Sequence, residues 1–356
     1  MAALPATQKQ VEVKKLVTDF HEITQIASGP VPSPGKQQFL IKTRYVGINA
    51  TDVNKSAGRH SYSSSDLKLP FVAGMEAVGE VVKVGDSSKF KVGQYVACLP
   101  SGAFAEYAVG DDMTSILLPS ASAEFLALFV SGLTASVALE KEADLKPGKT
   151  VLVTAAAGGT GQYAVQLAKL AGCHVIGTCS DDAKAKFLKG LGCDRVVKYT
   201  EEDLNQVLSK EYPRGVDVVY ECVGKEMFDA ALKSLAQFGR LIVIGQVSAY
   251  KDDDNVRSFQ GLALASKSSD ICIPLTLMFK AASIRGMVLG AYMGDLQRHM
   301  DTLMKLLKEG KIKASTDMGK NVPSGPFVGL EKVADAVDHL FSRKNIGKVV
   351  VEVGKS

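Results

Sequence analysis

Residues Val151 to Ala164 read VLVTAAAGGTGQYA, an apolar run followed by three closely spaced glycines and the start of a helical pattern. The segment from Gly159 to Ala164 fits G-x-G-x-x-(G/A), in which the first glycine permits a tight turn and the second lets the backbone approach a pyrophosphate. The hexapeptide is a weak signal by itself, but an apolar strand precedes it and helical periodicity follows. The stretch therefore predicts a dinucleotide-binding turn at a helix N-terminus, rather than a purely structural glycine turn.

Strand and helix patterns alternate downstream of this turn. Strands are predicted at 175–176, 195–198, 216–221, 240–244 and 284–289, with helices that include 183–190 and 226–238. Apolar strands that alternate with helices indicate an α/β fold with a parallel sheet covered on both faces. The polar stretch 248–270 follows a strand end, and we interpret it as a solvated loop or as a lid over the ligand.

The first third of the chain predicts a different architecture. Short apolar or alternating runs at 39–45, 77–84, 94–99 and 103–109 are separated by glycines, which favours a sandwich or a small barrel. The character changes near residue 129, and the tail contains a helical pattern followed by a last strand. The expected division is a β-rich domain at 1–129, a nucleotide-binding domain at 130–290 and a return to the first domain at 291–356.

Composition excludes several classes of protein. The chain has 356 residues, and its 42 Lys and Arg against 38 Asp and Glu leave a formal net charge of +4. That balance argues against a nucleic-acid partner or binding to an anionic membrane, and no run is predicted to span a membrane. The six cysteines form no C-x-x-C pair and no secretory signal is evident, so we expect reduced thiols in the cytoplasm.

The residues after the second strand indicate which dinucleotide is bound. NAD-binding sites usually hold the ribose hydroxyls with an acid near this point, and here Cys179 takes its place. Ser180 can hydrogen-bond to a 2′-phosphate, and Lys184 can pair with it one helical turn later. Asp181 and Asp182 would repel a phosphate if they pointed inward, but they are typical of a helix cap and first turn. We therefore predict NADP(H) rather than NAD(H).

Several motifs together resemble the medium-chain dehydrogenase/reductase family. They are GINATD at 47–52, AGMEAVGEV at 73–81, GAFAEY at 102–107 and the glycine-rich loop at 155–161. The resemblance covers nearly the whole chain and implies a GroES-like β-rich catalytic domain together with a Rossmann doubly wound parallel sheet.

The same comparison argues against a catalytic metal. Zinc alcohol dehydrogenases of the family carry a cysteine where Asn49 stands and a histidine where Met75 stands, and these side chains help to hold the zinc. Asn49 and Met75 cannot form that site, and the five histidines show no metal-ligand spacing. The sequence is therefore similar to the zinc-free branch, which contains quinone oxidoreductases and enone reductases, and we expect no metal.

This resemblance implies a function. The implied activity is NADPH-dependent reduction of the C=C bond of α,β-unsaturated ketones, such as 15-oxoprostaglandins, by hydride transfer to the β-carbon. We accordingly expect a small hydrophobic carbonyl substrate and a homodimer, with an NADPH quinone oxidoreductase and a non-catalytic NADPH-binding protein as alternatives. The resemblance makes a peroxisomal location the alternative to the cytoplasm, although residues 354–356 do not match the S-K-L signal.

Three residues are candidates for catalysis. Asn49 stands at the former ligand position, so it is expected to face the cofactor and stabilise an enolate, unless it is a structural amide in a turn. Tyr62, in a serine-rich loop at 60–66, is a second candidate donor, against the alternative of a plain surface loop. Asp52 is a weaker candidate, because an acid at this place more readily orders the turn of the first domain.

The resemblance and the strand ends together imply the residues around the cofactor. Tyr199 and Tyr250 have ordinary alternatives as a strand-end residue and a loop aromatic, and Asn345 as a turn former. The backbone of 287–289 is expected to meet the nicotinamide amide. The full predicted set is Gly158, Gly159, Thr160, Gly161, Ser180, Lys184, Tyr199, Cys222, Ile244, Tyr250, Met287, Val288, Leu289 and Asn345.

Overall fold

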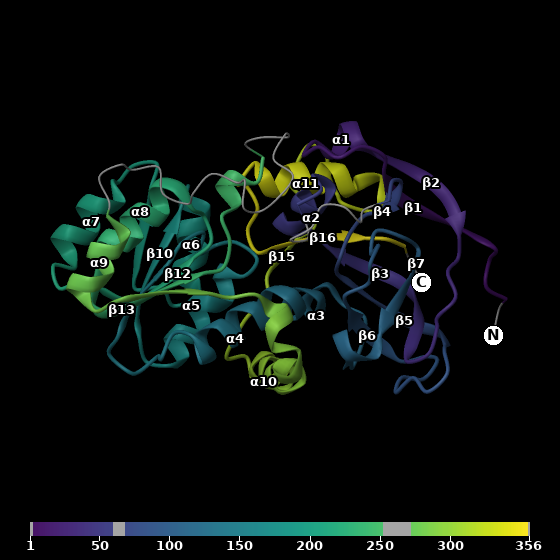
Figure 1. Ribbon diagram of the computed structural model, residues 1–356, viewed down its shortest axis with the longest axis horizontal. Helices are drawn as coiled ribbons and strands as arrows, with labels where there is room; N and C mark the ends of the chain where they lie inside the picture. Colours follow the sequence, from purple (N-terminus) through teal and green to yellow (C-terminus); the bar gives the residue numbers. More distant parts are fainter. Residues whose placement is uncertain (1–2, 60–67, 252–271, 355–356) are drawn as a thin grey trace. The chain divides into compact units, whose positions relative to one another are not determined.

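The computed structural model describes residues 3–59, 68–251 and 272–354, and these divide into two compact units. The first unit comprises the described residues up to 130 together with 316–354, and the second comprises 131–251 and 272–315. Each unit has its own sheet and its own hydrophobic core (Figure 1). Most of the polar stretch predicted as a loop or lid lies outside the described residues.

The second unit is built on a six-stranded parallel sheet with the strand order β11-β10-β9-β12-β13-β14. Counted along the chain this order is 3-2-1-4-5-6, the arrangement of dinucleotide-binding Rossmann folds. The predicted α/β class and parallel sheet are therefore confirmed. The strands are β9 (Thr150–Val153), β10 (His174–Cys179), β11 (Arg195–Lys198), β12 (Val216–Glu221), β13 (Leu235–Val243) and β14 (Ser283–Gly286).

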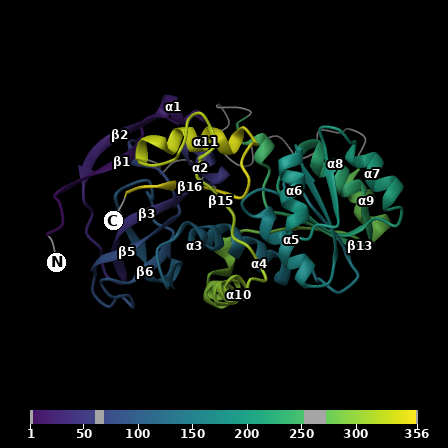
Figure 2. The same cartoon turned by 180° about the vertical axis from the view of Figure 1, so that it is seen from behind.

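Helices cover both faces of this sheet, which explains why the central positions of its strands are mostly apolar. On one face Leu152, Ile176 and Val219 share a buried core with side chains of α7 and α8. On the other face α5 contacts β9 and β10, and α4 packs on α5 (Figure 2). The helices are α4 (Leu133–Lys141), α5 (Gly161–Leu170), α6 (Asp182–Gly190), α7 (Leu204–Glu211), α8 (Lys225–Lys233), α9 (Ile273–Lys280) and α10 (Leu296–Lys308).

One predicted helix is shorter in the structure. The pattern predicted a helix over 226–238, but α8 ends at Lys233 and β13 begins at Leu235. Leu235 is buried in the core and pairs with Val216 of β12, so its packing favours an extended chain there. Phe238 has a positive φ of 62° and is exposed, which no regular helix accommodates.

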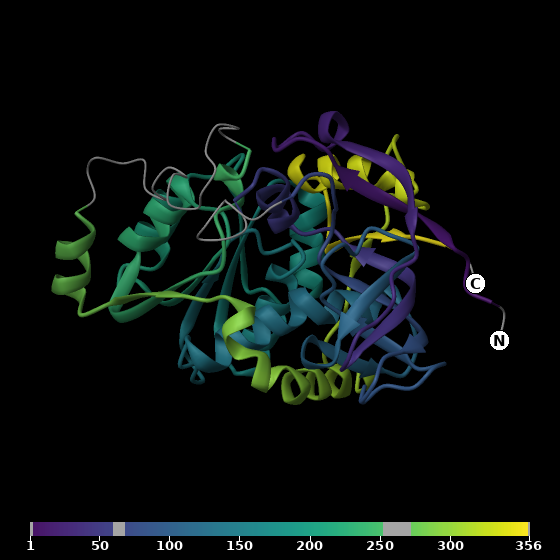
Figure 3. The ribbon, with the colours of Figure 1, turned by 45° about the vertical axis from the view of Figure 1, so that its right-hand side comes forward.

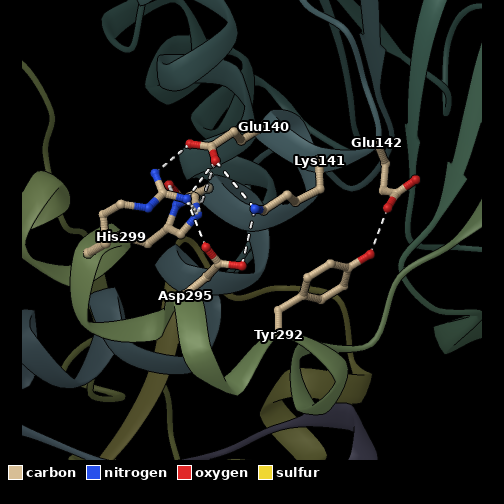
Figure 4. Close-up of polar contacts among 8 residues, drawn as sticks. Glu140, Lys141, Glu142, Tyr292, Asp295 and His299 are labelled. Carbon is tan, nitrogen blue, oxygen red and sulfur yellow. Dashed lines mark hydrogen bonds and ion pairs between the residues drawn. The ribbon is translucent and has the colours of Figure 1, made fainter.

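The segment 291–315 stays with the second unit, whereas the sequence analysis placed the return to the first domain at 291. The reason is that α10 and the 3₁₀ segment before it, η6 (Leu289–Asp295), pack against α4. Arg298 makes two hydrogen bonds to the carboxylate of Glu140, at 2.9 and 2.6 Å. The hydroxyl of Tyr292 donates to Glu142 at 2.6 Å, as Figure 4 shows.

The first unit contains a curled sheet with the strand order β15-β16-β3-β5-β6-β8, and β7 pairs with β3. A smaller sheet, β2-β1-β4, lies in the same unit; Figure 3 shows the hairpin of β1 and β2 in purple. The predicted β-rich first domain is confirmed. The strands are β1 (Thr7–Val13), β2 (Thr24–Pro30), β3 (Gln38–Gly47), β4 (Phe71–Val72), β5 (Ala77–Val84), β6 (Tyr95–Cys98), β7 (Tyr107–Asp111), β8 (Ser115–Leu118), β15 (Thr316–Asp317) and β16 (Lys348–Glu352).

The core of the first unit joins parts of the chain that are far apart in sequence. Phe39 and Phe104 pack in one buried cluster with Phe327 and Val337 from the C-terminal part. The strand β16 lies antiparallel to β3, with Val351 opposite Val46. The helices of this unit are α1 (Phe20–Ile23), α2 (Ala50–Ser56), α3 (Ala123–Ala127) and α11 (Val333–Phe341).

One continuous helical stretch, Ala123–Lys141, is long and apolar enough to cross a membrane by length and composition. It consists of α3, a π-helical turn η3 (Leu128–Gly132) and α4. Of its most apolar window, 67% is buried inside the structure, as in a core helix. Within residues 3–59, 68–251 and 272–354, no other helix meets these criteria.

Candidate functional site

The carboxyl ends of all six parallel strands lie at one edge of the second unit's sheet, where such sheets bind ligands. Most of the residues predicted for the cofactor follow these strand ends, so the topology brings them to the same edge. They are Gly158 to Gly161 after β9, Ser180 after β10, Tyr199 after β11, Cys222 after β12, Ile244 and Tyr250 after β13, and Met287 to Leu289 after β14.

The glycine-rich turn is tightly packed. A Cβ added to Gly161 would lie 2.4 Å from the carbonyl oxygen of Ala155, so only glycine fits there. Ala155 itself has a positive φ of 47°, and its carbonyl accepts a hydrogen bond from the Gly158 N–H at 2.9 Å. The helix α5 begins at Gly161 without a side-chain cap, and the N-terminus of a helix is a place where anions bind. These features fit the pyrophosphate of a dinucleotide.

The hydroxyl of Thr160, just before α5, is engaged within the second unit. It donates to the carbonyl oxygen of Ser131 at 3.1 Å and lies 2.6 Å from the hydroxyl of Tyr220. Since a hydroxyl has one hydrogen, Tyr220 is then the donor of the second bond. Burial raises the pKa of Tyr220 well above its ordinary value, so it stays protonated and able to donate. The hydroxyl of Thr160 is therefore engaged, whereas its backbone is part of the glycine-rich turn.

A buried carboxylate, Glu221, fixes the point where the strand order reverses between β9 and β12. It accepts N–H bonds from Val223 at 2.8 Å and Gly224 at 3.0 Å, and the Thr154 hydroxyl at 3.2 Å. The same Thr154 hydroxyl accepts the N–H of Cys222 at 2.8 Å. Burial raises the pKa of Glu221 to about 6, and the N–H bonds oppose that shift. Glu221 was not among the predicted site residues, although an acid at the end of an apolar strand could have indicated it.

Ser180 and Lys184, predicted for the 2′-phosphate, are in contact. Lys184 Nζ donates to Ser180 Oγ at 3.1 Å, and the lysine side chain is only 8% exposed. Asp181 is the N-cap of α6, as predicted, because its Oδ1 accepts the N–H of Lys184 at 3.0 Å. Its Oδ2 also accepts the Ser180 hydroxyl at 2.7 Å and lies 3.8 Å from Lys184 Nζ. Asp182 is directed away and pairs with Lys198 at 2.7 Å.

The other predicted cofactor residues are held mainly through their backbones. The N–H groups of Tyr199, Ile244 and Met287 donate to carbonyls of the neighbouring strands at 2.8–3.1 Å. The hydroxyl of Tyr250 accepts the Gln246 N–H at 3.2 Å.

Two predicted residues differ from this group. Asn345 belongs to the first unit, where its Nδ2 donates to the Gly347 carbonyl at 3.0 Å, the contact expected of a turn former. Tyr62 lies outside the described residues. Contact of either residue with the cofactor or substrate stays a prediction.

A buried polar cluster in the first unit, formed by Asn49, Asp52, Glu76 and Lys348, contains two of the three catalytic candidates. Asn49 precedes α2, and its N–H donates to Asp52 Oδ2 at 2.8 Å. Its side-chain Nδ2 donates to Glu76 Oε2 at 2.9 Å and to the Gly47 carbonyl at 3.2 Å. Its Oδ1 accepts from Lys348 Nζ at 2.5 Å. Both amide hydrogens of Asn49 are therefore engaged.

Lys348 and Glu76 form a buried ion pair at 2.8 Å, with side chains 3% and 0% exposed. Glu76 Oε1 also accepts the N–H of Val130 at 3.0 Å, so both carboxylate oxygens are satisfied. The sequence analysis assigned neither residue to a site. The signal available was a charged residue inside an apolar run for the glutamate, at 73–78, and at the start of one for the lysine, at 348–351. Such charges stay buried only when they are paired.

Asp52 lies next to this ion pair and has an unusual titration. Burial raises its pKa to about 7, although the hydrogen bond from Asn49 and the charge of Lys348 lower it. Its Oδ1 has no hydrogen-bond partner among the described residues. Asp52 therefore changes its protonation near neutral pH, next to the amide of Asn49.

In the part of the chain that the structure describes, no three His, Cys, Asp or Glu side chains are grouped to hold a metal ion. At Asn49 and Met75, where related zinc enzymes carry ligands, the amide oxygen of Asn49 is bonded to an ammonium group instead.

The chain is similar to known families and proteins over nearly its whole length. Residues 35–120 match the alcohol dehydrogenase GroES-like domain and residues 159–309 match the zinc-binding dehydrogenase family. The chain is 47% identical to prostaglandin reductase-3 of Mus musculus, over 99% of this chain and 91% of that protein. It is 40% identical to a probable quinone oxidoreductase of Leishmania amazonensis, over 98% and 99% of the two chains.

Solved structures show the same architecture. A mycobacterial protein in complex with NADPH superposes with a TM-score of 0.81 at 26% identity, over 97% of this chain and 99% of that chain. A quinone oxidoreductase of Pseudomonas syringae gives a TM-score of 0.79 at 28% identity, with the same coverage of both chains.

Proposed function

Since the chain belongs to the medium-chain dehydrogenase/reductase family and is an NADPH-dependent oxidoreductase, we propose that it reduces the C=C bond of α,β-unsaturated ketones without zinc. The observation that carries the substrate class is the 47% identity over nearly the full chain to prostaglandin reductase-3. Substrates of this class are small hydrophobic carbonyl compounds, with 15-oxoprostaglandins as the first candidates.

The second unit supplies the residues that would hold NADP(H). The turn at Gly158 to Gly161 and the N-terminus of α5 would bind the pyrophosphate, and Ser180 with Lys184 the 2′-phosphate. When bound, the cofactor supplies the hydride for the β-carbon of the enone. The protein then has to position the carbonyl compound and stabilise the charge that develops on its oxygen.

The positive charge of Lys348 in the polar cluster supports the proposal that the protein works without zinc. A divalent cation at Asn49 would lie beside the ammonium of Lys348, which is already paired with Glu76 in a buried environment. Two positive charges in contact repel each other strongly in a buried environment of low dielectric constant. Neither the amide of Asn49 nor the thioether of Met75 replaces the thiolate and imidazole that zinc prefers.

In this proposal Asn49 stabilises the developing oxyanion by exchanging one hydrogen bond. Its bond to the Gly47 carbonyl is the longer of its two donated bonds, 3.2 against 2.9 Å, so this is the one released toward the substrate oxygen. Lys348 and Glu76 hold the two ends of the amide and fix which end donates. Asp52 holds or releases a proton at the same turn near neutral pH.

Quinone reduction is the second candidate function, because the 40% identical relative is a probable quinone oxidoreductase. One experiment separates the two: NADPH oxidation is followed by absorbance with a 15-oxoprostaglandin, a short enone and an ortho-quinone in parallel. We expect turnover of the enones, with the saturated ketone as product by mass spectrometry and no loss of rate after treatment with a chelator. Turnover of the quinone alone would contradict the proposal and favour the second function.

We further propose that the protein is a homodimer formed through the edge of the second unit's sheet. The strand β14 is an edge strand, and a second copy could pair with it about a twofold axis. The neighbouring helix α9 is apolar but has no buried residue, and Phe279 is 76% exposed. Size-exclusion chromatography with light scattering tests this proposal. Phe279→Glu is expected to give monomers, and a monomeric parent protein would overturn the proposal.

A further inference from the structure

We propose that Asp181 is an internal competitor for the 2′-phosphate of NADPH, and that it limits the preference of this protein for NADPH over NADH. The inference rests on the proposed placement of the 2′-phosphate at Ser180 and Lys184. Asp181 is part of neither that placement nor any catalytic role described above. Its carboxylate nevertheless contacts both groups that would bind the phosphate.

Ser180 cannot donate to Asp181 and to a phosphate at the same time. Its hydroxyl has a single hydrogen, which it donates to Asp181 Oδ2 at 2.7 Å. Its oxygen meanwhile accepts from Lys184 Nζ at 3.1 Å. A phosphate oxygen can only accept hydrogen bonds, so it must take the hydrogen that Asp181 now holds. Binding of the 2′-phosphate therefore breaks the bond between Ser180 and Asp181.

The charge of Asp181 also opposes the binding of a phosphate. Although burial opposes ionisation, the N–H and ammonium of Lys184 and the hydroxyl of Ser180 lower the pKa of Asp181, so it is ionised at neutral pH. Its Oδ2 lies 3.8 Å from Lys184 Nζ, where it neutralises part of the charge that would attract a phosphate. A phosphate bound to the same lysine is then repelled by the carboxylate.

The competition of Asp181 with the phosphate is separate from its role as a helix cap. The two oxygens of Asp181 have different tasks, because Oδ1 caps α6 through the Lys184 N–H and Oδ2 faces Ser180 and the ammonium. Asparagine can keep the cap with its oxygen, and its amide can donate to Ser180 Oγ. Asp181→Asn therefore removes the competing charge and frees the Ser180 hydrogen, while α6 keeps its N-cap.

NADH gives the opposite expectation. It carries a ribose hydroxyl in place of the 2′-phosphate, and a carboxylate at the end of the second strand is the group that binds this hydroxyl in NAD enzymes. Asp181 follows that strand by two residues. Its carboxylate thus weakens NADPH binding and can accept a hydrogen bond from NADH. Both effects reduce the preference for NADPH over NADH.

The test is the dissociation constant of each cofactor, measured by fluorescence titration at one fixed ionic strength. Asp181→Asn is expected to tighten NADPH binding about fivefold to tenfold and to leave NADH binding unchanged or weaker. Asp181→Ser, which also keeps an N-cap residue, should shift the ratio in the same direction. Asp182→Asn is the matched control, since it removes the same charge from a side chain that is 89% exposed.

The results separate competition by Asp181 from the proposed binding of the 2′-phosphate at Ser180 and Lys184. The double variant Ser180→Ala/Lys184→Ala should weaken NADPH binding far more than NADH binding, and an equal loss for both would refute the placement. If the placement holds but Asp181→Asn binds NADPH no more tightly than the parent, the competition is refuted. An equal gain in Asp182→Asn would also refute it, because the effect would then be one of net charge alone.

Discussion

The ammonium of Lys348 lies 2.5 Å from the side-chain oxygen of Asn49, although the two residues are 299 positions apart in the chain. The contact settles the orientation of the Asn49 amide, since the oxygen faces the lysine and the nitrogen faces Glu76 and the Gly47 carbonyl. An amide held at both ends loses little conformational entropy when it meets a substrate. Lys348 and Glu76 therefore act as positioning residues in the proposed mechanism.

Two variants separate the effect of the Lys348–Glu76 ion pair on stability from its effect on the orientation of the Asn49 amide. Lys348→Met leaves Glu76 as an unpaired buried charge, which should lower the free energy of unfolding by about 3–5 kcal/mol in urea denaturation. Lys348→Met/Glu76→Gln removes both charges and should recover most of that stability. Turnover should stay low in both variants because the amide of Asn49 is no longer fixed. Recovery of turnover in the double variant would contradict the positioning role.

The titration of Asp52 predicts how stability changes with pH. Its pKa of about 7 lies above the ordinary 3.8, so between these values the native state holds a proton that the unfolded chain has released. Stability from this group is full below the ordinary pKa and is lost as the pH rises toward 7. Asp52→Asn should therefore be more stable than the parent at about pH 8, by roughly 1–3 kcal/mol, and equal near pH 4.

Thermal unfolding across that pH range checks this prediction. Asp301→Asn, at an exposed position of α10, is the control for the loss of a carboxylate elsewhere in the chain. Parallel stability curves for Asp52→Asn and the parent would show that Asp52 does not hold its proton in the native state.

Substitutions at the catalytic candidates should separate chemistry from cofactor binding. Asn49→Ser keeps a residue that can cap α2 but removes the amide, and we expect a loss of turnover of about 10²-fold or more with unchanged NADPH affinity. Tyr62→Phe should also lower turnover without changing that affinity. Asn205→Ala, exposed on α7, is the control. Unchanged turnover in both variants would remove Asn49 and Tyr62 from the mechanism.

The glycine-rich turn predicts a loss that is the same for both cofactors. In Gly161→Ala the new methyl group would meet the Ala155 carbonyl at 2.4 Å, so the turn must open and the helix N-terminus must shift. Binding of NADPH and NADH should weaken by the same factor, because the pyrophosphate is common to both. Gly190→Ala is the control, since a Cβ there meets no atom within 4 Å. Unchanged affinity in Gly161→Ala would place the pyrophosphate elsewhere.

Local patterns predicted those parts of the fold that local packing decides. The strands 195–198 and 216–221 have their predicted bounds, because the apolar spacing there matches one regular structure. The start of β13 was wrong, because the helical pattern of 226–238 competes with the burial of Leu235, which only the sheet reveals. Propensity gave way to tertiary packing at that point.

The same reasoning applies to the candidate site. The phosphate turn and the pair Ser180 and Lys184 were predicted because each is local in sequence. Lys348 was not, because its partners Glu76 and Asn49 come from distant segments and a single sequence shows no pairing between them. The contact of Asp181 Oδ2 with Ser180 was not predicted, because the role of helix cap accounts for only one of the two carboxylate oxygens.

The strand β16 has a consequence for how the protein is made on the ribosome. It carries Lys348 and pairs with β3, so the sheet of the first unit stays incomplete until the last part of the chain has emerged. All of the second unit has been synthesised by then, since it ends at residue 315. A nascent chain therefore holds Glu76 without its cation for most of its synthesis, and translation that stops before residue 348 yields a first unit that cannot neutralise this carboxylate.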